Sequence, residues 1–227
     1  MVRMQRPSRT LARSTPVWVA LALAGALLGP ATAGEPDPRE VAARLQEWLD
    51  GTRDLEGEFR QTLRSGALGS GISESGKLYI ARPGKMRWDY TDPERKVALL
   101  DGDRTTLWIE EDEQVILGRL GADSDLLPRL LVGDGRIDEL FEVSAARPGE
   151  DGGLYHLRLV PRRASDTLEE VVLWVRPPAC SIEGAEVLDS AGNRIEYRFS
   201  GLRRNRGIPE QRFRFAPPAG AEVLGEH

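Results

Sequence analysis

Apolar and polar positions alternate along most of the chain, and two short runs show this pattern most clearly. Leu78 and Ile80 form the first run, and Met86, Trp88 and Tyr90, separated by charged residues, form the second. Successive side chains of a β-strand point to opposite faces, so a period of two predicts strands with one apolar face. We expect these side chains to lie together on the buried face of a sheet.

The segment between the two runs reads Arg82-Pro83-Gly84. Proline sets φ for the first central position of a type II turn, and glycine accepts the positive φ of the second. The two runs are therefore predicted to be the strands of a hairpin.

A helical pattern precedes the first strand. Asp37 can cap the helix, and Pro38 suits its first turn. The apolar residues at the spacing of one helix face are Val41, Leu45, Trp48 and Leu49. Such a helix requires an apolar surface on which to pack.

The period of two continues after this helix and predicts about a dozen strands. Phe59 lies on the apolar face of the first of them. The predicted strands are residues 55–64, 72–81, 85–90, 96–100, 105–110, 114–117, 141–145, 154–161, 168–175, 182–189, 194–202 and 212–215. Strands that are neighbours in sequence are expected to pair antiparallel.

Residues 124–131 interrupt the strands with a different pattern. They contain a cap candidate and a proline in the first turn, and they are predicted to form a short helix that ends near Gly133. Its apolar residues are Leu127, Leu130 and Leu131. No linker or repeat separates the elements, so we expect one domain of the mainly β (α+β) class. Its single curved antiparallel sheet would have an apolar concave face covered by the two helices.

The first residues have the pattern of a secretory signal peptide. Four arginines precede an apolar run at residues 17–28, and Ala31-Thr32-Ala33 is a small-residue cleavage site. We therefore expect residues 1–33 to be cleaved and residues 34–227 to form a soluble periplasmic protein. A membrane anchor is the alternative, but the run is shorter than the ~20 residues that a spanning helix needs.

The charge balance weighs against nucleic-acid binding. Removing the leader takes four arginines from the 31 basic and 36 acidic residues, which leaves 27 against 36 and a net charge of −9. Nucleic-acid binders usually carry a basic stripe and a positive balance. The local cluster of Arg203, Arg204 and Arg206 is interpreted as a solvated turn, with a docking patch for anionic headgroups or a partner as the alternative.

Few residues are suited to catalysis. The two histidines are His156, expected to be exposed on a strand, and His227 at the C-terminus. Cys180, the single cysteine, therefore has no plausible base, and serine triads and most zinc sites also need histidine. We expect neither an enzyme nor a metal or cofactor site. Paired-carboxylate hydrolysis stays an open but poorly supported alternative.

Residues 76–90 resemble the periplasmic outer-membrane lipoprotein carrier (LolA) family. That family has glycine, leucine, arginine-proline and tryptophan at the spacing of Gly76, Leu78, Arg82-Pro83 and Trp88. The resemblance extends from about Glu35 to the C-terminus. Its further landmarks are Pro93, Asp101-Gly102, Leu107-Trp108, Tyr155, Leu157, Leu159, Pro161, Asp189, Gly192-Asn193, Phe213, Phe215, Pro217-Pro218, Gly220-Ala221 and Val223.

The resemblance implies an incomplete β-barrel with a helical lid over an apolar cavity. Arg82 matches the family arginine that contacts the lid and controls its opening, so it is the expected lid latch. The expected acyl-chain lining is Phe59, Leu78, Ile80, Met86, Trp88 and Tyr90. The expected lid residues are Val41, Leu45, Trp48, Leu49, Leu127, Leu130 and Leu131. A plain turn arginine and ordinary core residues are the alternatives.

The same resemblance implies a carrier that takes acylated lipoproteins from the inner membrane and shields their acyl chains until they reach the outer membrane. The implied donor is an inner-membrane lipoprotein-releasing ABC transporter. The implied recipient is an outer-membrane acceptor lipoprotein or the outer membrane itself. The carrier is expected to be a monomer without a cofactor, and it has no phosphate-binding loop of its own.

Other functions stay open on the sequence alone. The fold could carry a glycolipid or polycyclic lipid, or sense mislocalised lipoproteins, and an esterase is the remaining enzyme class. Gly84-Lys85 stands where the family often has more apolar residues, and residues 118–138 hold few family landmarks. The second half of the lid is therefore the least defined part of the prediction.

Overall fold

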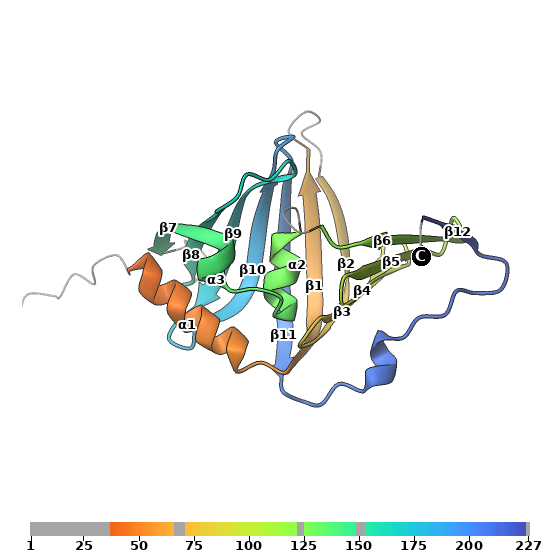
Figure 1. The fold of residues 1–227 in the computed structure, drawn as a ribbon, viewed down its shortest axis with the longest axis horizontal. Coiled ribbons are helices and arrows are strands. Elements are labelled where there is room, and N and C mark those ends of the chain that lie inside the picture. Colours follow the sequence, from red (N-terminus) through yellow and green to blue (C-terminus); the bar gives the residue numbers. More distant parts are fainter. Residues whose placement is uncertain (1–36, 66–70, 122–124, 149–152, 226–227) are drawn as a thin grey trace, which may run out of the picture. The chain divides into compact units, whose positions relative to one another are not determined.

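The computed structural model describes residues 37–65, 71–121, 125–148 and 153–225. Within them, twelve strands form one open, curved sheet in the order β12-β6-β5-β4-β3-β2-β1-β11-β10-β9-β8-β7 (Figure 1). The strands are β1 Asp54–Arg64, β2 Gly71–Ala81, β3 Lys85–Asp92, β4 Lys96–Asp101, β5 Arg104–Ile109, β6 Gln114–Arg119, β7 Phe141–Pro148, β8 Tyr155–Pro161, β9 Leu168–Arg176, β10 Ser181–Asp189, β11 Arg194–Arg204 and β12 Glu222–Leu224. The mainly β fold is thus as expected.

Two antiparallel meanders make up the sheet. Strands β1 to β6 form one and β7 to β11 the other, and β1 joins them by pairing antiparallel with β11. The predicted strand at residues 212–215 is wrong, because a 3-10 helix spans Glu210–Phe213 instead. The short strand β12 was not predicted, and it pairs parallel with β6.

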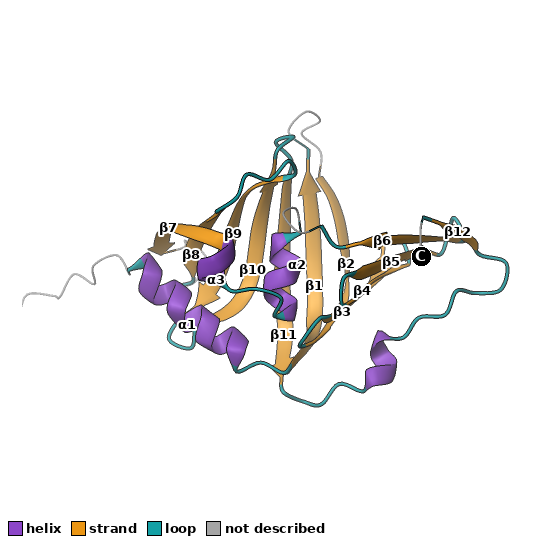
Figure 2. Cartoon of the chain, in the orientation of Figure 1, coloured by secondary structure: helices purple, strands orange, loops and turns teal. Residues whose placement is uncertain are grey.

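The three α-helices of the described residues lie on one face of the sheet (Figure 2). Helix α1, Pro38–Asp50, begins after Asp37, whose carboxylate accepts a hydrogen bond of 2.9 Å from the backbone N–H of Arg39. Helix α2, Leu126–Val132, ends at Gly133, whose φ of +80° favours glycine. Both helices were predicted. Helix α3, Ile137–Leu140, was not.

The apolar faces of these elements meet in one core. Helix α1 packs against β7, β8 and β10, α2 against β2, and α3 against β7. The buried lid residues are Val41, Leu45, Leu49, Leu127, Leu130 and Leu131, whereas Trp48 is half-buried. Burying one such leucine is worth about 1.5–3 kcal/mol, which holds the helices on the sheet.

The predicted hairpin joins β2 to β3. Ala81 faces Lys85 across the loop, and Gly84 has the expected positive φ, at +81°. The Arg82–Pro83 peptide bond is cis. The loop also contacts helix α2, because the N–H of Gly84 donates to the carbonyl of Val132 at 2.9 Å.

The outer face of this hairpin is covered by the C-terminal segment. Arg87 Nη1 donates to the carbonyl of Arg212 at 3.1 Å, and Lys85 forms an ion pair with Glu210. The guanidinium of Arg212 lies 4.6 Å from the ring centre of Tyr79. Tyr79 is therefore buried, although its place in the alternation had put it on the polar face.

Candidate functional site

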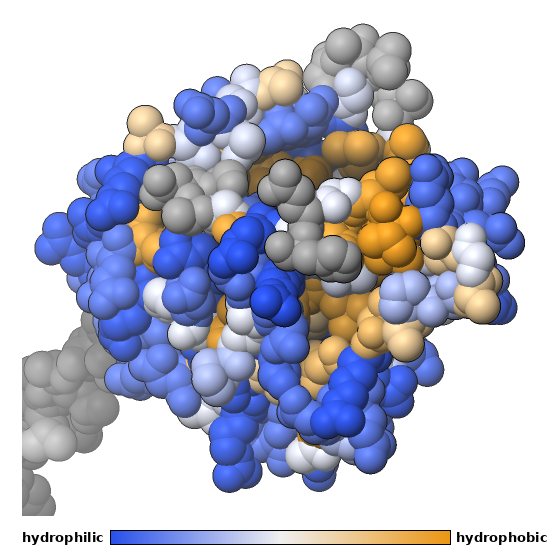
Figure 3. Space-filling model, turned by 45° about the vertical axis from the view of Figure 1, so that its right-hand side comes forward, coloured by the Kyte–Doolittle hydropathy of each residue, from blue (hydrophilic) through white to orange (hydrophobic). Residues whose placement is uncertain are grey.

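An open cleft of about 510 Å³ lies on the concave face of β3 to β6, beside α2. Its volume is within the ~300–1,000 Å³ typical of ligand sites. Its apolar part is lined by Met86, Trp88, Ala98, Leu100, Leu107 and Ile116. Figure 3, turned to bring this side of the sheet forward, shows apolar surface set between hydrophilic margins. The hollow is a cleft and not an enclosed cavity.

Strand register explains why the face is hollow here. Trp88 pairs with Ala98, Ala98 with Leu107, and Leu107 with Ile116, so a single row crosses four strands. Paired residues of antiparallel strands point to the same face. The small side chain of Ala98 stands between two large ones and leaves space for an apolar ligand.

Trp88, which lines the cleft, belongs to an aromatic cluster that continues into the core behind it. The ring centre of Trp88 lies 4.5 Å from that of Phe59 and 5.4 Å from that of Tyr197. The indole N–H of Trp88 donates to the sulfur of Met86 at 2.7 Å, so no indole donor is left unpaired in the apolar part. Trp88 and Tyr90 are the aromatic side chains that line the cleft, and their rings can contact hydrocarbon.

The structure divides the predicted lining residues into two groups. Met86, Trp88 and Tyr90 line the cleft. Phe59, Leu78 and Ile80 are only 1–2% exposed and belong to the core behind it. Their contact with acyl chains stays a prediction.

Tyr197 and Phe199 belong to the same aromatic cluster, but the sequence did not single them out. The ring centre of Phe199 lies 6.2 Å from that of Trp88. The only sequence signal was their alternation with charged residues in the strand predicted at residues 194–202. Burial raises the pKa of Tyr197 to about 12.

Arg82 lies between the carboxyl ends of α1 and α2. Its Nη1 donates to the carbonyl of Leu49 in the last turn of α1. Its guanidinium also lies so close to Gly133, which ends α2, that a Cβ there would be 2.7 Å from Nε. A cation suits this place, because the carboxyl end of a helix carries partial negative charge. Partial burial lowers the pKa of Arg82.

Other residues hold the same end of α1, whose last turn has no basic residue of its own. Arg204 Nη1 donates to the carbonyl of Trp48 at 2.9 Å. Asn205 Nδ2 donates to the carbonyl of Gly51 at 2.9 Å. Arg204 is exposed, as expected, but it ends strand β11 instead of lying in a turn, and its guanidinium lies over the Trp48 ring at 5.2 Å.

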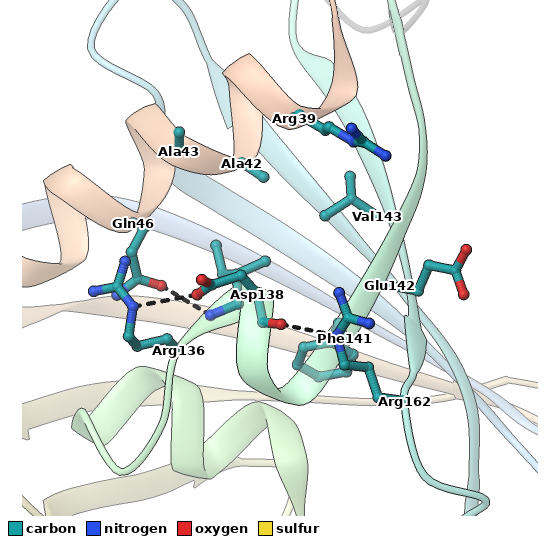
Figure 4. Close-up of a pocket in the computed structure, with 11 residues that line it drawn as sticks. Arg39, Ala42, Ala43, Gln46, Arg136, Asp138, Phe141, Glu142, Val143 and Arg162 are labelled. Atoms are coloured by element: carbon teal, nitrogen blue, oxygen red, sulfur yellow. Dashed lines mark hydrogen bonds and ion pairs between the residues drawn. The ribbon is translucent and has the colours of Figure 1, made fainter.

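A second hollow, of about 520 Å³, lies between α1, α3 and β7 (Figure 4). The side-chain oxygen of Gln46 accepts the backbone N–H of Ile137 at 2.9 Å. Arg136 forms an ion pair of 3.1 Å with Asp50, and Arg162 Nε donates to the carbonyl of Asp138 at 2.8 Å. These contacts tie α3 to α1 and to the end of β8, so the polar groups of this hollow hold the helices together.

Two of the candidates for chemistry, His156 and Cys180, lie within the described residues. His156 is half-buried and stacks on Trp174 at 5.7 Å, which corrects the expected exposure. Cys180 is 2% exposed, and burial raises the pKa of its thiol. Across the described residues, no three His, Cys, Asp or Glu side chains are grouped to hold a metal ion. None of the described helices has the length and apolar character needed to cross a membrane.

Comparison with known proteins gives consistent matches over most of the chain. Residues 50–216 match the family model described as "Outer membrane lipoprotein carrier protein LolA". An outer-membrane lipoprotein carrier protein of Chromobacterium violaceum is 33% identical over 92% of this chain and 96% of its own length. One of Methylococcus capsulatus is 32% identical over 86% of this chain and 91% of its own.

A structural match supports the fold. A solved structure of an uncharacterized conserved protein from Thermus thermophilus aligns with a TM-score of 0.51 at 11% identity. The alignment covers 82% of this chain and 97% of that one. At this identity the likeness bears on the fold alone.

Proposed function

Because this chain belongs to the outer membrane lipoprotein carrier (LolA) family, we propose that it carries acylated lipoproteins to the outer membrane. The observation that supports this most directly is the apolar cleft of about 510 Å³ beside a helical lid. Hydrocarbon chains would lie along the row from Trp88 to Ile116. The proposed function therefore consists of binding and releasing the cargo, without a chemical reaction on it.

The physical need for a carrier follows from the cost of exposing acyl chains to water. Each methylene kept from water is worth about 0.8 kcal/mol, so even part of an acyl chain outweighs a few polar lid contacts. Entry of the chain into the cleft would therefore open the lid. Release would let the lid close again.

Arg82 is the proposed latch of this lid. It contacts the carbonyl of Leu49 in α1 and lies against Gly133 at the end of α2, so one side chain bridges both helices. A guanidinium holds backbone carbonyls through several donors and can lose them together. The empty carrier would be latched, and the loaded carrier unlatched.

The route and the partners follow from the family and from the first residues of the chain. Residues 1–33 lie outside the described residues, and we propose that they are a cleaved signal peptide and that residues 34–227 act in the periplasm as a monomer. The proposed donor is an inner-membrane lipoprotein-releasing ABC transporter. The proposed recipient is an acceptor lipoprotein or the outer membrane, and these two set the direction of transfer.

Mass spectrometry of material that copurifies with the exported protein tests the proposal. We expect acylated peptides, bound in about one copy per chain as a single ligand cleft implies. Trp88→Glu, with a charge in the cleft, serves as the comparison and should lose them. Free glycolipid or polycyclic lipid in their place would favour another cargo, and hydrolysis of an added acyl ester would favour an enzyme.

A further inference from the structure

One end of the cleft is polar, and the family function does not require it to be. Gln61, Glu74, Tyr90 and Lys96 line the cleft together with its apolar residues, and we call them the polar band. They come from strands β1, β2, β3 and β4, which are neighbours in the sheet. The polar band therefore crosses the concave face at one end of the apolar row.

Hydrogen bonds and charge link the members of the polar band. Tyr90 Oη donates to Gln61 Oε1 at 2.9 Å, and Gln61 Nε2 donates to Glu74 Oε2 at 3.4 Å. Lys96 forms an ion pair with Glu74, and its Nζ lies 4.8 Å from the ring centre of Tyr90. Burial raises the pKa of Tyr90, so its hydroxyl stays a donor.

Stability alone does not explain a partly buried ion pair on the concave face of the sheet. Removing two charges from water costs several kcal/mol per ion, and apolar residues of similar volume often serve stability equally well. Yet the side chains of Lys96 and Glu74 are only 21% and 13% exposed. Both side chains line the cleft.

The donors of the polar band indicate which ligand groups would fit there. The ammonium group of Lys96 has three donors, and Glu74 occupies part of this capacity. The second amide hydrogen of Gln61 is a further donor. Because Glu74 and Lys96 cancel each other's charge, the polar band favours neutral acceptors over a phosphate. Ester and amide carbonyls have this chemistry.

We propose that the polar band binds the ester and amide carbonyls of the cargo's acylated N-terminus, while its hydrocarbon chains lie along the apolar row. This inference rests on the proposed carrier function and assigns the end of the cleft that receives the lipid head. The polar band thereby distinguishes an acylated peptide from a simple hydrocarbon. It also sets the direction in which the chains enter.

Binding of three fluorescence-detected ligands to the whole exported chain tests this assignment. The ligands are a diacylated lipopeptide, its ether-linked analogue without ester carbonyls, and the neutral dye N-phenyl-1-naphthylamine. We expect the wild-type protein to bind the ester form about tenfold more tightly than the ether form, as for hydrogen bonds to a charged donor. Equal affinity for both forms would overturn the assignment without any variant.

A paired variant tests the residues themselves. Glu74→Gln with Lys96→Met removes the ion pair without leaving a lone charge, and we expect it to bind the ester form as weakly as the ether form and the dye as before. The matched control is Glu58→Gln with Lys77→Met, since these oppositely charged residues lie opposite each other on β1 and β2 and are exposed. It should keep the wild-type preference.

The outcomes separate this assignment from the carrier function. If the wild-type protein binds all three ligands but the paired variant retains the ester preference, the polar band has no role and the carrier function stands. If the wild-type protein binds neither lipopeptide nor dye, the carrier function itself fails.

Discussion

Arg82 joins the loop between β2 and β3 to both lid helices. The sequence singled it out through its place before proline, and the structure adds its contact with the Leu49 carbonyl and its position against Gly133. Those two residues are far from Arg82 in sequence. The sequence could therefore point to this residue but not to the atoms that it contacts, and its role as a latch stays a prediction.

Replacement of Arg82 by leucine should impair release more than uptake. The empty closed state loses a hydrogen bond to a charged group, worth about 1.5–3 kcal/mol, while the loaded open state loses nothing. Transfer from the carrier to acceptor membranes should therefore fall about tenfold or more, with folding and loading retained. A transfer assay with radiolabelled lipoprotein measures this.

Two matched variants sharpen the test of the latch. Arg82→Lys keeps the charge but not the planar fork, and it should transfer at an intermediate rate. Arg204→Leu removes a guanidinium from the neighbouring carbonyl of Trp48, outside the β2–β3 loop. Normal delivery by Arg82→Leu would remove Arg82 from the mechanism.

Tyr197 gives the molecule a measurable response to alkaline pH. Its pKa rises from the ordinary 10 to about 12 on folding because burial disfavours the phenolate. The stability that it contributes is fully present below pH 10 and is lost as the pH rises toward 12. Urea unfolding across this range should show a smaller loss for Tyr197→Phe than for the wild-type chain. Identical losses would contradict the buried position of the hydroxyl.

Strand β3 combines the floor of the cleft with the outer surface of the sheet. Met86, Trp88 and Tyr90 line the cleft, whereas Lys85 and Arg87 bind the C-terminal segment on the other face. The alternation of the sequence predicted this division correctly. It could not show that the outer face is also covered, because the covering residues lie more than one hundred positions away (Arg87 to Arg212, separation 125).

A carboxylate on the inner face of β3 should impair acyl binding more than folding. Met86→Glu or Trp88→Glu places a charge in the apolar part of the cleft, and acyl affinity should fall at least tenfold, since burying an unpaired charge costs several kcal/mol. Dye binding and thermal unfolding should be measured together. Ser73→Glu on the exposed part of β2 is the control. Unfolding of both variants without residual binding would instead assign these residues to the core.

At the scale of the whole molecule, the sequence predicted features that depend on neighbouring residues but not contacts between residues that are distant in the chain. The cap at Asp37 and the turn at Gly84 depend on neighbouring residues, so their positions followed from the sequence. The 3-10 helix at Glu210–Phe213 and strand β12 depend on strands that are remote in the chain, and both were missed. The hollow at Ala98 could not be predicted either, because it depends on the strand register.

The antiparallel pair of β1 and β11 has a consequence for the order of events during folding. Leu55 lies opposite Arg204, so the centre of the sheet closes only when nearly the entire chain is present. Contacts of such sequence separation carry a large loop-closure entropy and slow the formation of the native topology. The nascent chain thus stays without its central strand pair until late in synthesis, which would suit the proposed export.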